Sequence, residues 1–289
     1  MVNGSRTLKR RRRCADEIRE IRGAIKAVLE EDHPQSVRHV FYRLVGLGLI
    51  PKEQAGYRTV QSQLLKLRED GVVPWGWVSD GTRWRKHRLT FNDQAEAVRH
   101  AADTYRRDLW SRTPAYVEVW CESDSIAGVL VPEVDRYDVP LMTSRGFSSR
   151  TYLYRAAQEI KIEDRPAYLY YVGDWDPSGK IIPEKIEETL RRFAPNAEIH
   201  FERLLVTPEQ ISEWDLPTKP AKKTTHAKNF TGGTVEAEAV PARRTRNILR
   251  AAIERHLDMR EVAVIREAEA SEAHALSFIA DTIEQGAIQ

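Results

Sequence analysis

The sequence has few cysteines and no long hydrophobic run. Cys14 and Cys121 offer neither the spacing of a zinc site nor enough thiols for a disulfide framework, so we expect both to be reduced thiols. No apolar run approaches the roughly twenty residues that cross a bilayer, and no segment of the signal-peptide kind opens the chain. We therefore expect a cytoplasmic protein without a membrane partner.

The sequence also lacks a phosphate-binding loop for ATP. Residues 173–180 include one residue too many for a Walker A motif, and Ile181 follows where that motif needs Ser or Thr. Asp174 and Asp176, which lie inside this segment, would repel the phosphates of a nucleotide. The chain is therefore not expected to hydrolyse ATP by itself.

Charge is distributed unevenly along a chain that is otherwise typical of a globular protein long enough for two domains. Residues 1–100 contain 20 Lys+Arg and 12 Asp+Glu, a balance of +8, whereas the remainder carries 25 against 31, a balance of −6. A basic front third is where a polyanion would bind, and we expect the polyanion to be DNA.

The front of the chain predicts a winged-helix domain over residues 14–91, preceded by a basic tail over residues 1–13. Three amphipathic helices and then a hairpin with a basic, aromatic strand are expected at 15–31, 36–46, 57–70, 72–78 and 82–88. Clustered basic side chains of the tail and the hairpin are the expected DNA contacts. They are Arg10, Arg11, Arg12, Arg83, Arg85, Lys86 and Arg88.

The rear of the chain predicts a second, α/β domain over residues 112–289, with a connecting helix at 92–111 before it and a helical extension at its end. Strand and helix patterns alternate, which is typical of a Rossmann-like parallel sheet. The strands are expected at 116–121, 139–142, 168–172 and 199–206. The polar stretch 208–233 is expected to lie on the surface.

Three acidic residues follow two of these strands. Glu122 ends the first strand, and Asp174 and Asp176 follow the strand at 168–172. If the two strands are neighbours, the carboxylates converge at one sheet edge and form a hard-oxygen site suited to Mg²⁺. The alternative is turn chemistry, because Asp-Pro-Ser-Gly also suits the start of a helix, near Pro183. Glu118, four residues earlier than Glu122, is expected to lie too deep to be a ligand.

These residues resemble a known pair of domains. Glu122, followed about fifty residues later by a strand and Asp174-x-Asp176-Pro-x-Gly, resembles a Toprim domain. Residues 37–42, Val-Arg-His-Val-Phe-Tyr, resemble the catalytic-tyrosine segment of the topoisomerase VI A subunit and its meiotic double-strand-break relatives. The similarity covers residues 36–192, and the length is similar to that of the small stand-alone Mini-A branch.

The resemblance implies a DNA-cleaving transesterase of the type IIB topoisomerase A-subunit kind. Tyr42 would attack a phosphodiester and stay joined to the 5′ phosphate, and Arg38, one helical turn earlier, would stabilise the charge that develops. Glu122, Asp174 and Asp176 would hold Mg²⁺ at the scissile phosphate. The resemblance also implies a nucleoid-associated homodimer on duplex DNA, in which each tyrosine meets the metal site of the other subunit, and a separate ATPase B-like partner if strand passage occurs.

The sequence departs from the family pattern at two places. Ser123 follows the Toprim glutamate where relatives often have lysine, and the loop at 146–149 lacks the proline common in the topoisomerase form. Two alternatives therefore stay open. One is a hydrolytic Toprim nuclease in which Tyr42 is structural, and the other is a winged-helix DNA-binding protein without catalysis.

Overall fold

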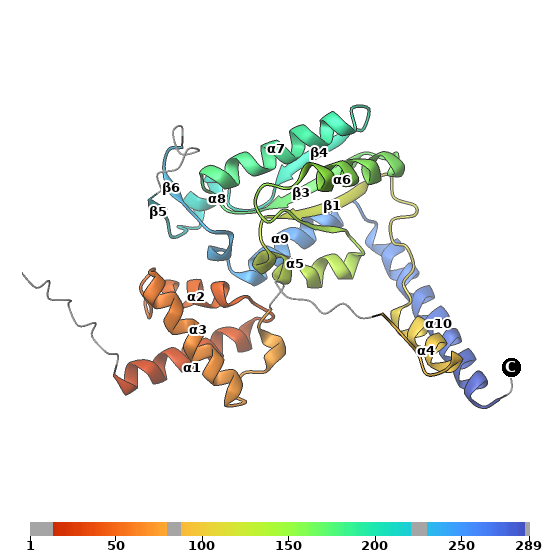
Figure 1. Cartoon of the computed structure of the whole chain (residues 1–289), viewed down its shortest axis with the longest axis horizontal. Coiled ribbons are helices and arrows are strands. Elements are labelled where there is room, and N and C mark those ends of the chain that lie inside the picture. The colour runs from red at the N-terminus through yellow and green to blue at the C-terminus, as the bar shows by residue number, and fades with distance from the viewer. Residues whose placement is uncertain (1–13, 80–87, 221–229, 287–289) are drawn as a thin grey trace, which may run out of the picture. The chain divides into compact units, whose positions relative to one another are not determined.

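The computed structural model describes residues 14–79, 88–220 and 230–286 and divides the chain into two compact units, Met1–Ser79 and Asp80–Gln289 (Figure 1). The predicted DNA contacts in the tail and most of those in the hairpin fall outside the described residues; of the seven, Arg88 alone is described, and it is exposed. No helix within these ranges combines the length and the hydropathy needed to cross a membrane.

Unit 1 contains the three predicted helices, which are α1 (Ala15–Glu31), α2 (Val37–Gly46) and α3 (Gln54–Glu69). The Ser36 hydroxyl begins α2 by accepting a hydrogen bond from the His39 backbone N–H, as expected of an N-cap serine. The apolar faces of the three helices meet in one core. Its most buried members are Ile25, Leu29, Val40, Leu44, Val60 and Leu64.

The strand predicted at residues 72–78 is wrong. Trp75–Trp77 forms a short 3₁₀ helix, η1, that starts after Pro74, and the Trp77 N–H bonds back to the Pro74 carbonyl at 3.1 Å. The Arg68 guanidinium, on α3, lies 4.0 Å from the centre of the Trp75 ring and holds this turn against the helix. Since residues 80–87 lie outside the described ranges, the second half of the expected hairpin is not described either.

Unit 2 is built on a four-stranded parallel sheet, which confirms the α/β class. The strands are β1 (Tyr116–Cys121), β2 (Leu141–Thr143), β3 (Ala167–Val172) and β4 (Ile199–Arg203), in the order β2-β1-β3-β4. Helix α5 (Asp124–Tyr137) and helix α9 (Ala242–Glu254) cover one face of the sheet, and α6 (Arg150–Glu163) and α7 (Pro177–Phe193) cover the other (Figure 1).

The connections of this sheet reverse direction between β1 and β3. The chain goes from β1 through α5 to β2 on one side, and then crosses through α6 to β3 on the other side. Open α/β sheets bind their ligands at such a switch point, beyond the carboxyl ends of the strands. A ligand site is therefore expected at the residues that follow β1 and β3.

The remaining elements differ from expectation mainly in their limits. Helix α4 (Gln94–Thr104) packs along the last helix, α10 (Met259–Glu284), and is shorter than the helix predicted over 92–111. Leu109 and Trp110 leave the helix and enter the core of the sheet, where the Trp110 ring N–H donates to the Tyr137 carbonyl at 2.6 Å. Burial of these two side chains therefore overrides the helical pattern.

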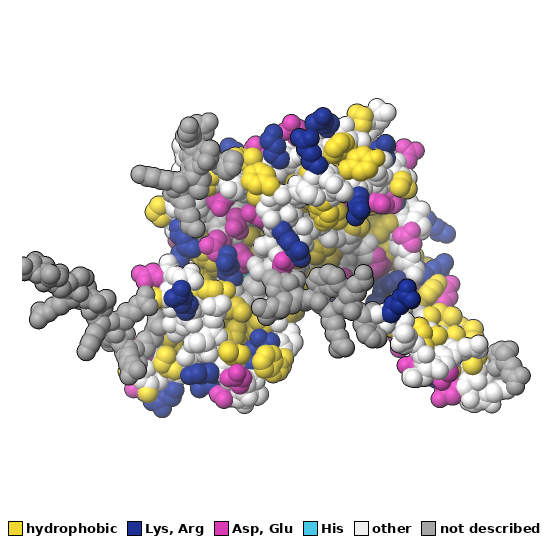
Figure 2. Space-filling view, in the orientation of Figure 1, with side chains coloured by type: hydrophobic (Ala, Val, Ile, Leu, Met, Phe, Trp, Pro, Cys, Tyr) yellow, Lys and Arg dark blue, Asp and Glu magenta, His cyan; other side chains and the backbone are white. Residues whose placement is uncertain are grey.

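The polar stretch 208–233 includes short elements of its own. Strand β4 ends at Arg203, three residues earlier than predicted, and helix α8 (Pro208–Glu213) follows with Thr207 as its N-cap. Strand β5 (Lys219–Pro220) pairs with β6 (Gly233–Thr234). The 3₁₀ turn η3 (Ala237–Ala239) then leads into α9. Side chains of both charge signs are interspersed over the face of unit 2 seen in Figure 2.

Candidate metal-dependent active site

Glu122 and Asp174 meet at the switch point. Strands β1 and β3 are neighbours, with Cys121 opposite Val172, so the residues that follow them emerge side by side. The Glu122 Oε2 atom accepts hydrogen bonds from the Asp174 backbone N–H at 3.1 Å and from the Tyr171 hydroxyl at 3.3 Å. Glu122 and Asp174 are therefore neighbours at this sheet edge, but the three predicted carboxylates do not form a group that could hold a metal ion among the described residues.

Alternation along β1 explains the side of the sheet that Glu122 faces. Val117, Val119 and Cys121 point into the core beneath α5 and α9, whereas Trp120 points into the core beneath α6 and α7. Glu122 continues the second set, and its bond to Tyr171, whose ring lies in the same core as Trp120, is made on that side. The carboxylate thus lies at the end of the sheet, toward α6 and α7.

Gly173 allows the close approach of the two strand ends. A Cβ atom at this position would lie 2.8 Å from Glu122 Oε2 and 2.6 Å from the Tyr171 hydroxyl. Real Cβ contacts are longer than this, so any side chain here would displace the Glu122 carboxylate. A side chain at this position would therefore move the Tyr171 hydroxyl or the Glu122 carboxylate from the positions seen here.

The two aspartates hold separate backbone groups. Asp174 Oδ1 accepts the Ala237 N–H at 2.8 Å, and Asp176 Oδ1 accepts the Gly179 N–H at 2.6 Å. Asp176 is thereby the N-cap of α7, with Pro177 in the first turn, as the alternative of turn chemistry predicted. The helix begins six residues earlier than the Pro183 expected from the sequence.

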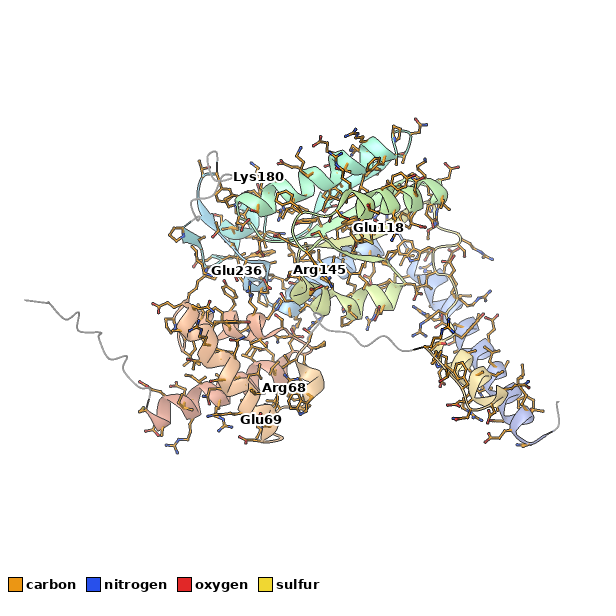
Figure 3. The ribbon with its side chains drawn as sticks, viewed as in Figure 1. Arg68, Glu69, Glu118, Arg145, Lys180 and Glu236 are labelled. Carbon is orange, nitrogen blue, oxygen red and sulfur yellow. The ribbon has the colours of Figure 1, made fainter. Side chains whose placement is uncertain are left out.

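A segment from far along the sequence lies against these acids. Val235 and Trp175 exchange two backbone hydrogen bonds, of 2.8 and 2.9 Å, which place Glu236 and Glu238 near Asp174. Glu238 is 3% exposed and accepts a hydrogen bond from the Ser125 hydroxyl. Arg145, Lys180 and Glu236 can be followed around the same end of the sheet in Figure 3.

Burial and like charge make this site costly to ionise. Burial raises the pKa of Asp174 to about 8, and the negative charges of Glu238 and Glu122 contribute to the rise, against the hydrogen bond from Ala237. Burial also raises the pKa of Glu122, as does the charge of Asp176, while the bond from the Asp174 N–H lowers it. A cation placed among these oxygens would remove the penalty.

Arg203, at the end of β4, supplies a nearby positive charge, and its described hydrogen bonds go to the backbone. Its guanidinium donates to the carbonyls of Gly173 at 3.1 Å, Asp174 at 3.3 Å and Leu205 at 3.3 Å, and also to that of Gly179. It therefore fixes the backbone that carries the acids, and burial lowers its pKa. The carboxylate oxygens remain for another cation.

The donor set fits Mg²⁺ bound partly through water. Within residues 14–79, 88–220 and 230–286, no three His, Cys, Asp or Glu side chains gather closely enough to hold a metal ion. Mg²⁺ commonly takes one or two carboxylates and keeps several waters, so Glu122 and Asp174 are the candidate ligands, and Asp176 is the third acid that the sequence predicted. Their hard oxygens are of the kind that such an ion prefers, and Arg203 supplies part of the balancing positive charge.

The predicted nucleophile lies in unit 1. Tyr42, on α2, is 5% exposed; its ring meets Phe41 edge-on at 5.2 Å, and the Lys52 ammonium lies 5.3 Å from the ring centre. The Arg38 guanidinium lies 5.9 Å from the centre of the Tyr57 ring, and its role toward Tyr42 stays a prediction. Lys52 is a second cation near the phenol ring that the sequence did not indicate.

Four residues of these two regions were not predicted from the sequence. They are Lys52, Arg203, Glu236 and Glu238. A basic residue at the end of a predicted strand was a usable signal for Arg203, since all strands of a parallel sheet end at one edge. No pattern in the sequence relates Glu238 to Asp174, because they are joined through a bridge between distant segments.

Comparison with known proteins adds no family to this description. No protein-family model matches the chain, and no curated protein matches it either. The resemblance to Toprim and topoisomerase VI A segments therefore depends on the quoted residues alone, and the functional argument depends on the geometry of the site.

Proposed function

We propose that this chain cleaves DNA in a Mg²⁺-dependent reaction, with Glu122, Asp174 and Asp176 as the acids that hold the ion. The observation that carries the proposal is the meeting of Glu122 and Asp174 at the switch point of a parallel sheet, where burial raises the pKa of both carboxyls. Phosphodiester cleavage is the reaction best served by oxygen-held Mg²⁺ in a chain with a basic front third.

The residues around the acids act by keeping the acids and their loop in fixed positions. A bound Mg²⁺ supplies charge stabilisation at the scissile phosphate and the leaving 3′ oxygen. Glu122 is oriented by the Asp174 N–H and the Tyr171 hydroxyl, and Arg203 fixes the carbonyls of the loop between β3 and α7. Such preorganised groups need no rearrangement when charge develops in the transition state.

We assign the nucleophile to Tyr42, whose attack joins the phenol oxygen to the 5′ phosphate and releases the 3′ hydroxyl. Attack requires α2 to expose the phenol when DNA binds, because the side chain is 5% exposed. The Lys52 ammonium, 5.3 Å from the centre of the ring, is a positive charge beside the proposed nucleophile. Exposed polar and basic side chains on α3, namely Arg58, Gln61, Ser62 and Lys66, are of the kinds that contact a DNA groove and its backbone.

Hydrolysis is the second candidate, and the burial of Tyr42 favours it. If the phenol stays covered, a water activated at the acids is the nucleophile, and the products are free ends without attached protein. Both candidates use the same acids, so they differ only in what attacks. An ATP-driven topoisomerase reaction requires, in addition, a separate ATPase subunit.

Incubation of supercoiled plasmid with the protein and Mg²⁺, followed by gels with and without protease, tests the proposal. Tyr42→Phe is expected to abolish the denaturant-resistant protein–DNA adduct, a loss of at least about 10³-fold for removal of a nucleophile, while DNA binding persists. Glu122→Gln is expected to abolish both adduct and plain cleavage. Tyr57→Phe, which removes the hydroxyl of a neighbouring tyrosine, is the matched control and keeps activity.

The outcomes separate the candidates. Adduct from wild type and Tyr57→Phe but not from Tyr42→Phe supports transesterification. Nicking without adduct, equal in wild type and Tyr42→Phe and lost in Glu122→Gln, replaces it with hydrolysis. If cleavage persists in Glu122→Gln, or continues after EDTA removes Mg²⁺, the proposal that these acids form the active site is wrong.

A further inference from the structure

A groove runs between α6 and α7 on the outer side of the sheet. Its volume is about 380 Å³, and its floor is apolar. The floor and walls include Leu153, Ile182, Ile186 and Phe193 from the two helices and Phe147 from the loop before α6. Phe147 is 55% exposed, so more than half of its side-chain surface is accessible at the edge of the groove.

The rim of this groove is basic. Arg150, Lys185 and Arg192 line it together with one acid, Glu188, which accepts a hydrogen bond from Lys185 at 2.5 Å. No ion pair of Arg150 or Arg192 is found among the described residues, although Arg192 is close enough to Glu188 for its charge to help lower the pKa of that carboxyl, after the larger effect of Lys185. Figure 2 shows Lys and Arg side chains beside hydrophobic ones over α6 and α7. Two guanidinium groups are thus available to an anionic ligand, although residues 101–289 as a whole are acidic.

The groove is connected to the acid site through one loop. Residues 144–149 join β2 to α6, and the Ser144 backbone N–H and hydroxyl both donate to the Cys121 carbonyl, at 2.8 and 3.1 Å. Cys121 is the residue directly before Glu122, and Glu122 faces the side of the sheet that α6 and α7 cover. The loop that carries Phe147 thus begins beside the residue that precedes Glu122.

We propose that this groove binds single-stranded DNA, with phosphates on Arg150 and Arg192 and an unpaired base stacked on Phe147. The proposal rests on the proposed function, since it assigns a path to one strand of the substrate beyond the acids. A groove of this volume is too small for a duplex, whose stacked bases offer no face to Phe147. Basic side chains for the phosphates, beside an aromatic stacking surface, are the usual combination for single strands.

Binding of a fluorescent single-stranded oligonucleotide to the full chain, measured by anisotropy in EDTA over a range of salt, tests this site. The double variant Arg150→Gln/Arg192→Gln is expected to lower the slope of log K against log salt by about 1.4, since each phosphate that is no longer neutralised lowers it by about 0.7. Phe147→Ala is expected to weaken binding about 5-fold or more because a base can no longer stack there. Arg155→Gln, an exposed arginine of α6 outside the groove, is the control.

Each result decides the proposal. The proposal is supported if the double variant lowers the slope of log K against log salt, Phe147→Ala binds more weakly, and Arg155→Gln behaves like wild type. Wild-type affinity and slope in the double variant overturn it, and so does an equal loss for duplex and single strand with no effect of Phe147→Ala. The binding measurement contains no Mg²⁺, so its result does not depend on whether the protein cleaves DNA. Circular dichroism spectra show whether the variants fold.

Discussion

Glu118 is a carboxyl group inside the sheet that the proposed reaction does not use. It is 2% exposed, and it accepts hydrogen bonds from the Tyr116 hydroxyl at 2.6 Å and the Trp120 ring N–H at 2.8 Å. No basic side chain among the described residues forms an ion pair with Glu118. Burial raises the pKa of its carboxyl, while the two hydrogen bonds lower it. The position confirms that Glu118 lies too deep to be a ligand of an ion at the sheet edge.

Replacement of Glu118 by Gln is expected to stabilise the protein at high pH. A raised pKa means that the folded state holds a proton that the unfolded state has released, so the stabilising contribution is complete below the ordinary pKa of 4.5 and is lost as pH rises through the folded pKa. Glu118→Gln removes this loss and is therefore expected to be more stable than wild type at pH 8.

Urea unfolding of wild type and Glu118→Gln from pH 5 to pH 9 measures this effect. The gap between the two free energies of unfolding is expected to widen with pH. Glu184→Gln, which alters an exposed glutamate of α7, should follow wild type throughout. A gap that stays constant, or that narrows as pH rises, would show that Glu118 does not have a raised pKa.

At the scale of elements, the sequence predicted which strand ends lie side by side better than it predicted where the side chains that follow them point. Polarity changes sharply after two buried strands, and parallel sheets align their carboxyl ends, so the meeting of Glu122 with Asp174 was predictable. The direction of each aspartate was not. Asp174 turns to the Ala237 N–H, a partner 63 residues away, and Asp176 turns to the first turn of α7.

The front unit illustrates the same limit. Its helices were predictable because their apolar residues recur at helical spacing and Ser36 gives a cap. The stretch at 72–78 has strand-like composition, but Pro74 and Gly76 favour a turn, and Arg68 stacking on Trp75 stabilises it. Composition alone therefore could not separate a strand from a turn that a neighbouring helix holds in place.

Gly179 is expected to be essential for the shape of the loop between β3 and α7. A Cβ atom there would lie 2.2 Å from the Asp174 carbonyl oxygen, so Gly179→Ala must separate the first turn of α7 from that loop. Overpacking of this kind typically costs about 1–3 kcal/mol. We expect that loss of stability in denaturant unfolding. If wild type is stabilised by Mg²⁺, as the proposed function requires, we expect Gly179→Ala to lose that stabilisation as well.

Gly23→Ala provides the matched control for this substitution. Gly23 lies within α1, and a Cβ atom there meets nothing within 4 Å, so alanine should stabilise the protein by about 0.5–1 kcal/mol. If Gly179→Ala lowers the free energy of unfolding and Gly23→Ala raises it, the loss in Gly179→Ala comes from the close contact between residue 179 and the Asp174 carbonyl. Retention of wild-type stability and Mg²⁺ response by Gly179→Ala would mean that the loop tolerates a wider spacing and does not depend on this glycine.

For the whole molecule, the proposal divides the reaction between two units. The phenol of Tyr42 belongs to Met1–Ser79 and the acids belong to Asp80–Gln289. The front of the chain is basic and the rear acidic, which suits a front unit that binds DNA and a rear unit that binds a cation. If two chains act on a duplex about a two-fold axis, the phenol of one chain can work with the acids of the other.

Mixed dimers of two inactive variants test that arrangement. In a dimer of one Tyr42→Phe chain and one Glu122→Gln chain, a trans arrangement leaves one complete site, made of the Tyr42 of the Glu122→Gln chain and the acids of the Tyr42→Phe chain. A cis arrangement leaves none. Co-expression with two different tags, purification through both, and incubation with plasmid and Mg²⁺ are therefore expected to give nicked plasmid with covalently attached protein.

The identity of the attached chain makes the test specific. Tags of different mass reveal on a denaturing gel which chain holds the DNA, and the trans arrangement requires it to be the Glu122→Gln chain. A Tyr42→Phe chain paired with a Tyr42→Phe/Glu122→Gln chain is the negative control, since neither has a phenol at position 42. Absence of adduct from the mixed dimer, while wild type paired with Glu122→Gln forms it, would place each tyrosine with the acids of its own chain.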